Sequence, residues 1–379
     1  MRSKQHYQSY AFVRNTSLMN LRTSTDYDKM RPMKQKSSAG SDVSRSIKVL
    51  VLSVLCLQNS LYTVFRRYSL GVLKENYSKY EILLVAEIIK FLFSAFMVSR
   101  SSEYNKLLTH IIHLIKSSGK MFFLACLYGS MNILSFIALR EIGAGLFTIF
   151  AQLKIFSTAL FSAIILDRKY SATRIRALTE LLFGALLFSS NVLGDTDKLT
   201  QDKLLGIGAV VMEVITSGFA SIYFEKVLKT DQMKFNIWER NCQLAFNSVP
   251  IYICFILFGD GGEAGYFGGW TKLSVLLSLL GSAGGLLVAL SIKYADAILK
   301  TLATTLAIII SSLLDYFFLN GDLTYTMILS GGIVILAICN YSFDAATTES
   351  QLTKNVVGST HSRNDDSDRS KEMKPLITV

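Results

Sequence analysis

The sequence predicts an all-α membrane protein with ten transmembrane helices. The chain has 379 residues, of which 51% are hydrophobic and only 18% are charged, whereas a soluble domain averages about 25% charged residues. The apolar residues gather in long runs. Each run has about the 20 residues that a helix needs to cross the hydrocarbon core of a bilayer.

The predicted spans are joined mostly by short connections, which favours one compact ten-helix bundle over residues 47–343. The spans cover residues 47–65, 80–98, 121–139, 142–166, 175–193, 204–224, 241–258, 273–292, 297–319 and 325–343. The flanking segments, 1–46 and 344–379, are polar and are predicted to be disordered tails. The N-terminal tail lacks an apolar signal-peptide core, so the first span is expected to stay as an uncleaved anchor.

The distribution of Lys and Arg predicts the orientation of the bundle. An even number of spans places both tails on one side, and the loops on that side carry more Lys and Arg than the loops opposite. Because positive residues are retained on the cytosolic side, both tails are expected in the cytosol. The net charge of +11 is therefore attributed to basic loops and tails at a membrane face, and no nucleic-acid partner is expected.

Two segments, 138–176 and 291–329, share a layout at an offset of 153 residues. Each begins with a short basic hinge, at Arg140 or Lys293, and continues as one long apolar run. Each run ends in a tight polar turn before the next span, Asp167-Arg168 in one segment and Asn320-Gly321 in the other. Five spans separate the halves, so the hinges fall on opposite sides of the membrane. This pattern indicates two inverted five-helix repeats, a binding site near the midplane and a carrier that alternates access.

Lys154 lies at the middle of the apolar run 142–166. A lysine at the bilayer centre costs at least ~2.5–3.5 kcal/mol on insertion scales, and this one is too far from either end of its span to reach an interface easily. It must therefore face a polar interior, pair with an acid, or meet an anionic ligand. Glu213 and Glu180 are the candidate acids. We favour a site for an anionic substrate, with a structural Lys–Glu pair as the alternative.

Other polar residues and glycines also fall inside the spans. Glu87 and Lys90 are three residues apart on one helix face and are interpreted as an ion pair in which the two charges neutralise each other. Asn132 is either a polar contact between helices or a ligand contact. Gly284 and Gly285 remove side-chain bulk, which permits either close helix packing or the close approach of a planar ligand.

No metal, cofactor or catalytic centre is predicted. The five cysteines lie in or at the edge of apolar runs and form no CxxC pair, so neither a zinc site nor a disulfide framework is supported. A multispan glycosyltransferase would need an acidic cluster in a sizeable loop on the side opposite the tails. The longest loop there, 259–272, is short and has only Asp260 and Glu263 as acidic residues.

Several segments together resemble the nucleotide-sugar transporter family, the group of the drug/metabolite transporter superfamily that contains carriers of CMP-sialic acid, UDP-galactose and UDP-N-acetylglucosamine. The resemblance covers residues 47 to 343, in order and with like spacing. It rests on LQNSLYTVFRRYS (57–69), AEIIKFLFS (86–94), ALREIGAGLFTIFAQLKIFSTALFS (138–162), SGFASIYFEKVLK (217–229) and GSAGGLLVALSIKYADAILKTLAT (281–304). It implies that superfamily's ten-span fold and antiport of nucleotide sugar against nucleoside monophosphate in the Golgi membrane, or alternatively in the endoplasmic reticulum.

The same resemblance implies a substrate site without a metal. Its six residues are Lys154, Lys300, Asn132, Tyr223, Gly284 and Gly285. The two lysines match family residues taken to meet the substrate phosphates, and the asparagine matches an amide at the nucleobase end. The tyrosine matches the aromatic residue of the Y-F-E-K segment, and the glycine pair matches one beside the nucleotide.

Three residues depart from the family pattern. Phe147 stands where a tyrosine is usual, Met131 stands where a polar neighbour of Asn132 is common, and Asp315 has no counterpart in the pattern. The first two make the predicted pocket more apolar, which disfavours a charged sugar such as sialic acid.

We therefore expect a pyrimidine nucleotide-sugar antiporter, with UDP-N-acetylglucosamine or UDP-galactose favoured as the substrate. A CMP-sialic acid transporter, or another exporter of phosphorylated metabolites from the same superfamily, is the alternative. The expected partners are the nucleotide sugar, the nucleoside monophosphate and membrane lipids. A homodimer and an association with glycosyltransferases stay open.

Overall fold

The computed structural model describes residues 36–100, 107–190, 201–231, 235–258, 265–321 and 323–344, and within these ranges all regular structure is helical. The helices are α1 (Lys36–Arg67), which a short π-helix (Tyr68–Val72) extends, α2 (Lys79–Arg100), α3 (Leu107–Lys116), α4 (Gly119–Ala151), α5 (Lys154–Ile165), α6 (Ala172–Ser190), α7 (Gln201–Thr230), α8 (Ile237–Phe258), α9 (Lys272–Tyr294), α10 (Ala297–Leu319) and a last helix, Tyr325–Asp344. The all-α prediction is confirmed. The predicted tails lie largely outside the described residues.

Nine helical segments in the described part of the chain are long and apolar enough to cross a membrane, and they coincide with nine of the ten predicted spans. The other predicted span, 175–193, corresponds to α6, which is described as far as Ser190. α6 has 19 residues, and three of them, Arg174, Arg176 and Glu180, are charged, which is more than the apolar stretches of the other nine contain. The protein is thus a multi-pass helical membrane protein, and the count of ten spans stays a prediction.

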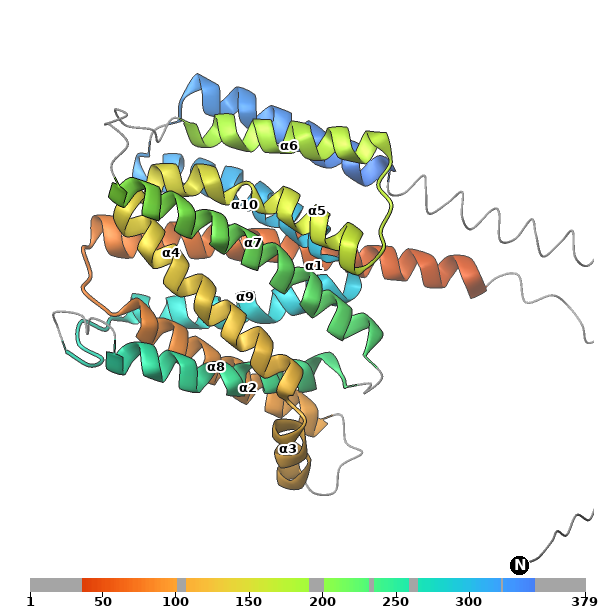
Figure 1. Cartoon of the computed structure of the whole chain (residues 1–379), viewed down its shortest axis with the longest axis vertical. Helices are drawn as coiled ribbons and strands as arrows, with labels where there is room; N and C mark the ends of the chain where they lie inside the picture. The colour runs from red at the N-terminus through yellow and green to blue at the C-terminus, as the bar shows by residue number, and fades with distance from the viewer. Residues whose placement is uncertain are drawn as a thin grey trace, which may run out of the picture. The chain divides into compact units, whose positions relative to one another are not determined.

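The described helices from residue 44 onward belong to one compact unit. In this unit α7 packs along α4 and α5, and α2 packs along α8 and α9 (Figure 1). Three clusters of buried apolar side chains join the helices: one connects α5, α6, α10 and the last helix, another connects α4, α7, α8 and α9, and a third connects α4 and α7. In a bilayer such contacts stabilise the bundle by van der Waals packing, because lipid tails are as apolar as the side chains.

The first predicted hinge, at Arg140, is confirmed as a bend near the boundary between the spans Gly119–Ile142 and Leu146–Ile165. The helical backbone of α4 continues through this residue, and its ribbon changes direction between its gold and yellow parts (Figure 1). The exposed Arg140 side chain pairs with the neighbouring Glu141 at 2.7 Å and needs no break in the helix. The interruption falls later, at Gln152 and Leu153. The predicted hinge in the second segment is a helix boundary, because α9 ends there and Asp296 caps α10.

The two predicted polar turns share the same backbone conformation. Asp167 has a φ of 51° and Asn320 a φ of 52°, so each adopts the left-handed conformation that closes a helix C-terminus. After α5, the Arg168 N–H donates to the Ser162 carbonyl at 3.4 Å. After α10, the Asn320 N–H donates to the Asp315 carbonyl. Both polar turns are confirmed, whereas the inverted symmetry of the two halves stays a prediction.

Candidate substrate site

The fourth predicted span is interrupted immediately before Lys154. α4 ends at Ala151 and α5 begins at Lys154. Between them the backbone bonds tighten to i, i−3 spacing, with the Gln152 N–H bonded to the Ile149 carbonyl at 3.1 Å and the Ile155 N–H bonded to the Gln152 carbonyl at 3.2 Å. Such a stretch inside a helix marks strain or a functional hinge, and interrupted helices line the substrate sites of many transporters.

Lys154, Glu213 and Lys300 form a charged group that we call the lysine cluster. They come from α5, α7 and α10, and both Glu213 and Lys300 lie within electrostatic range of Lys154. Lys300 Nζ also donates to Ser221 Oγ of α7 at 3.3 Å. With one carboxylate for two ammonium groups, the cluster keeps a surplus positive charge, and the positive N-terminal end of α5 adds to it.

Glu213 and Glu180 are the two acids that the sequence predicts as candidate partners of Lys154. In the structure Glu213 lies within electrostatic range of Lys154. Glu180 is exposed on α6 and accepts a hydrogen bond from Asn340 Nδ2 at 3.3 Å. Glu213 can balance one of the two lysines. The surplus charge is therefore available for an anionic ligand, and ammonium groups suit phosphate because they impose no single geometry on it.

Asn132 belongs to a second polar group, which joins α2, α4 and α8. Its Nδ2 donates to Oη of the buried Tyr252 at 3.0 Å. Glu87 of α2 lies within electrostatic range of Tyr252 and of Tyr128 on α4. The contact between Asn132 and Tyr252 connects two helices, and the predicted contact of Asn132 with a nucleobase stays a prediction.

Gly284 and Gly285 make room on α9 for polar side chains of α1 and α2. A Cβ atom at Gly284 would lie 2.6 Å from Nε2 of Gln58, and one at Gly285 would lie 3.2 Å from Cδ of Lys90. Lys90 Nζ lies 2.6 Å from Glu87 Oε1, so the predicted pair three residues apart is confirmed. The glycine pair therefore serves close helix packing in this conformation, and its contact with a ligand stays a prediction.

Tyr223 lies on a different face of α7 from the lysine cluster. It is two residues from Ser221, which is about 200° around a helix. Its ring packs against Phe123 and Phe219, with centroid distances of 5.3 and 6.0 Å. It also borders an open hollow of about 280 Å³ that is lined by Lys120, Tyr223, Lys226, Val227, Thr230 and Asp231. The structure thus does not bring Tyr223 together with the two lysines, and its role in binding stays a prediction.

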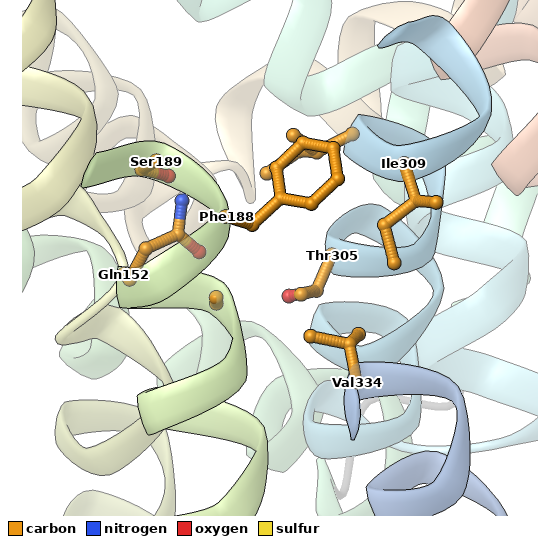
Figure 2. A pocket seen from close by; sticks show the side chains of 8 residues that line it. Gln152, Phe188, Ser189, Thr305, Ile309 and Val334 are labelled. Atoms are coloured by element: carbon orange, nitrogen blue, oxygen red, sulfur yellow. The ribbon is translucent and has the colours of Figure 1, made fainter. Parts of the chain in front are cut away.

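A small cavity lies beside the helix interruption (Figure 2). Its lining comes from the segment before α5, from α6, from α10 and from the last helix: Gln152, Ala185, Phe188, Ser189, Thr305, Ile308, Ile309 and Val334. Its volume of about 10 Å³ is close to the minimum for one water molecule, whereas small-molecule sites take roughly 300–1,000 Å³. This cavity is therefore too small to be the substrate site.

A family model described as "Nucleotide-sugar transporter" matches residues 43–342, which include all the membrane-spanning helices apart from their outermost residues. The chain belongs to the nucleotide-sugar transporter family. The resemblance found in the sequence is thereby confirmed. As a member of this family, the chain is a transporter and not an enzyme.

Individual relatives of this nucleotide-sugar transporter align along most of the chain. A UDP-N-acetylglucosamine transporter of Rattus norvegicus is 32% identical over 311 residues, covering 78% of this chain and 94% of the relative. The UDP-galactose/UDP-N-acetylglucosamine transporter srf-3 of Caenorhabditis elegans is 33% identical over 316 residues, covering 80% of this chain and 86% of the relative. A crystal structure of another protein, 13% identical, matches with a TM-score of 0.56 over 79% of this chain and 98% of that one, which supports the fold alone.

The structure adds two residues of this nucleotide-sugar transporter that the sequence analysis did not single out, Ser221 beside Lys300 and Tyr252 beside Asn132. Ser221 could have been found as a hydroxyl inside the resembling segment 217–229, but nothing in the sequence says which helix it faces. Among the described residues, His, Cys, Asp and Glu side chains form no group of three or more that could hold a metal ion. The expected absence of metal and cofactor stays a prediction.

Proposed function

We propose that this nucleotide-sugar transporter is an antiporter that carries a UDP-sugar, UDP-N-acetylglucosamine or UDP-galactose, into the Golgi lumen in exchange for a nucleoside monophosphate. In this proposal Lys154 and Lys300 bind the phosphates. Asn132, Gly284 and Gly285 lie toward the nucleoside, and Tyr223 lines the path on its side of α7.

The lysine cluster is the observation that carries this proposal. The ammonium group of Lys300 and the carboxylate of Glu213, on two other helices, both lie within electrostatic range of Lys154, and intramembrane charges of this kind are costly unless a partner uses them. A nucleotide phosphate supplies the missing negative charge. Because lysine binds phosphate as a point charge rather than through a rigid fork, the substrate can both bind and leave.

The surplus charge also supports exchange rather than one-way transport. An empty site would leave one ammonium group without a charged partner through the reorientation, whereas a bound nucleotide sugar or nucleoside monophosphate would pair its phosphate oxygens with both ammonium groups. A bare charge in a low-dielectric interior is unfavourable. The filled forms should therefore reorient faster than the empty form.

The preference for UDP-sugars is supported by the names of the two relatives described above, both UDP-sugar transporters. The amide of Asn132 can donate to and accept from one edge of a pyrimidine. Met131 and Phe147 are apolar where polar contacts to a charged sugar would be useful. CMP-sialic acid is therefore the second candidate substrate.

The cellular setting is part of the proposal. The Golgi membrane is favoured and the endoplasmic reticulum is the alternative, with both tails in the cytosol as the loop charges predict. The lysine cluster does not depend on a second subunit, so a homodimer or an association with a glycosyltransferase would be an additional property of the transporter.

Uptake into liposomes tests the proposed substrate. The purified chain is reconstituted, liposomes are loaded with UMP, CMP or GMP, and uptake of labelled UDP-N-acetylglucosamine, UDP-galactose, CMP-sialic acid and GDP-mannose is compared. We expect uptake of the two UDP-sugars, inhibited by external UMP. Inhibition by CMP alone would assign the chain to CMP-sialic acid, and inhibition by GMP as strong as that by UMP would contradict a pyrimidine site.

A further inference from the structure

Glu225 is a fully buried carboxylate near the C-terminal end of α7, with a relative exposure of 0%. Three donors surround it. Its Oε1 accepts from Arg168 Nη2 at 2.5 Å and from Lys229 Nζ at 2.7 Å, and its Oε2 accepts from the backbone N–H of Ala297 at 3.0 Å. A buried carboxylate with this many partners is strongly held, and the loss of any partner leaves a costly unpaired group.

The donors come from the two chain segments that carry the lysines of the cluster. Arg168 lies in the turn directly after α5, the helix that begins with Lys154. Ala297 is the first residue of α10, one turn before Lys300. Glu225 therefore connects the end of one lysine-bearing helix to the start of the other.

The same face of α7 contacts Lys300 itself. Ser221 precedes Glu225 by four residues, so the two side chains lie one above the other on the helix, and Ser221 Oγ accepts from Lys300 Nζ at 3.3 Å. α7 thus contacts α10 at two points. Glu225 accepts from the backbone N–H of Ala297, the first residue of α10, and Ser221 accepts from the side chain of Lys300.

Further bonds close this network around the start of α10. Lys229 Nζ donates to the Ala295 carbonyl at 2.6 Å, and Asp296 caps α10 by accepting from the Leu299 N–H at 2.8 Å. Arg168 Nη1 lies 3.9 Å from Asp296 Oδ2. The start of α10 is therefore fixed by charged side chains rather than by apolar packing alone.

We propose that Glu225 is a positioning residue of the transport site. It fixes the start of α10, and with it Lys300, relative to α7 and to the turn after α5, so that both lysines reach one phosphate group. This inference rests on the proposed function, because it assigns Glu225 a role only if the lysines bind the substrate phosphate. Glu225 does not touch the substrate and acts through Lys300.

The test separates positioning from a general role in folding by measuring KM and Vmax of exchange. In reconstituted liposomes, Glu225→Gln should raise the KM for the nucleotide sugar that the wild type transports best by roughly tenfold, the usual effect of a lost charge-assisted hydrogen bond. Vmax per reconstituted protein should change little. A purely structural role would lower the amount of active protein, and so Vmax, without changing KM.

A second variant keeps the charge of Glu225 and removes one of its partners near the start of α10. Lys229→Met deletes the ammonium group that donates to Glu225 Oε1 at 2.7 Å and to the Ala295 carbonyl at 2.6 Å. The Lys229 side chain is 36% exposed, so an apolar side chain of similar length fits there without overpacking. This variant should also raise KM, and it keeps the proposal testable if Glu225→Gln does not fold.

Asp344→Asn is the matched control. It removes the partner of Arg174, in an ion pair of 2.9 Å that joins α6 to the last helix and does not involve α7 or α10. Its KM should equal the wild-type value. An unchanged KM in both Glu225→Gln and Lys229→Met would overturn the positioning role while leaving the proposed function intact. An unchanged KM in Lys300→Ala would instead contradict the lysine site itself.

Discussion

At the scale of single residues, Lys154 combines two sources of positive potential. Its ammonium group lies near Lys300, and it is also the first residue of α5 after the helix interruption. The N-terminus of a helix carries a partial positive charge. Here the N–H groups of Ile155 and Phe156 already bond to carbonyls across the interruption, so an anion at this point meets mainly the ammonium groups, with a smaller backbone contribution of the same sign.

The first prediction removes the ammonium group. Lys154→Ala should reduce exchange at least roughly tenfold, because a charge-assisted contact to phosphate is lost. Lys154→Arg should also be impaired, since a planar fork replaces a compact ammonium group. The initial rate of exchange in liposomes measures both. Lys293→Ala, which changes an exposed lysine at the end of α9, should transport normally, and a near-normal rate for Lys154→Ala would remove this residue from the site.

Part of this site could be predicted from the sequence. The depth of Lys154 followed from the length of its apolar run, and the pairing of Glu87 with Lys90 followed from their spacing on one helix face. The interruption before Lys154 could not be predicted, because Gln152 and Leu153 are ordinary helix-forming residues. The neighbours that α7 and α10 supply depend on how distant segments pack.

At the scale of the elements, α5 and α7 approach each other closely at Gly218. A Cβ atom at this position would lie 2.8 Å from the backbone carbonyl carbon of Ser157, and it would also contact Ser157 Oγ. Backbone atoms cannot move aside as the end of a flexible side chain can. Small residues at such contacts are what lets membrane helices pack closely, so Gly218 sets the distance between the two helices that carry Lys154 and Glu213.

The second prediction compares two glycines of α7. Gly218→Ala should destabilise the protein by about 1–3 kcal/mol, the usual cost of overpacking. Gly208→Ala has no atom within 4 Å of its new Cβ, so it should be neutral or stabilising by up to about 1 kcal/mol. Thermal unfolding in detergent measures both, and equal melting temperatures would contradict the close contact of α5 with α7.

The elements themselves were largely predictable, because nine of the ten expected spans match helices that can cross a membrane. The polar turns at Asp167 and Asn320 were also predictable, since these residue types tolerate the left-handed backbone. The hinge near Arg140 was predictable as well, because α4 bends between the spans Gly119–Ile142 and Leu146–Ile165 (Figure 1). What the sequence did not indicate is that the helical backbone continues through this bend.

At the scale of the whole molecule, the third prediction concerns orientation. Both tails should be cytosolic, because the loops on their side carry the excess of Lys and Arg. In a chain freed of native cysteines, Ser3→Cys and Ser359→Cys should react with a membrane-impermeant maleimide in sealed Golgi vesicles. Thr324→Cys, in the turn before the last helix, should react only after detergent is added. Labelling of Thr324→Cys in sealed vesicles, or protection of either tail, would reverse the topology.

Exchange is the central claim about the whole molecule, and it depends on the surplus charge of the lysine cluster. The most direct measurement is uptake of a labelled UDP-sugar into liposomes that contain the purified chain, with and without UMP inside. Loading with UMP should accelerate uptake many-fold, because bound phosphate pairs with both ammonium groups during the reorientation while the empty site leaves one of them without a charged partner. Loading with uridine, which has no phosphate, is the control and should not accelerate it. Equal uptake into empty and UMP-loaded liposomes would contradict the account.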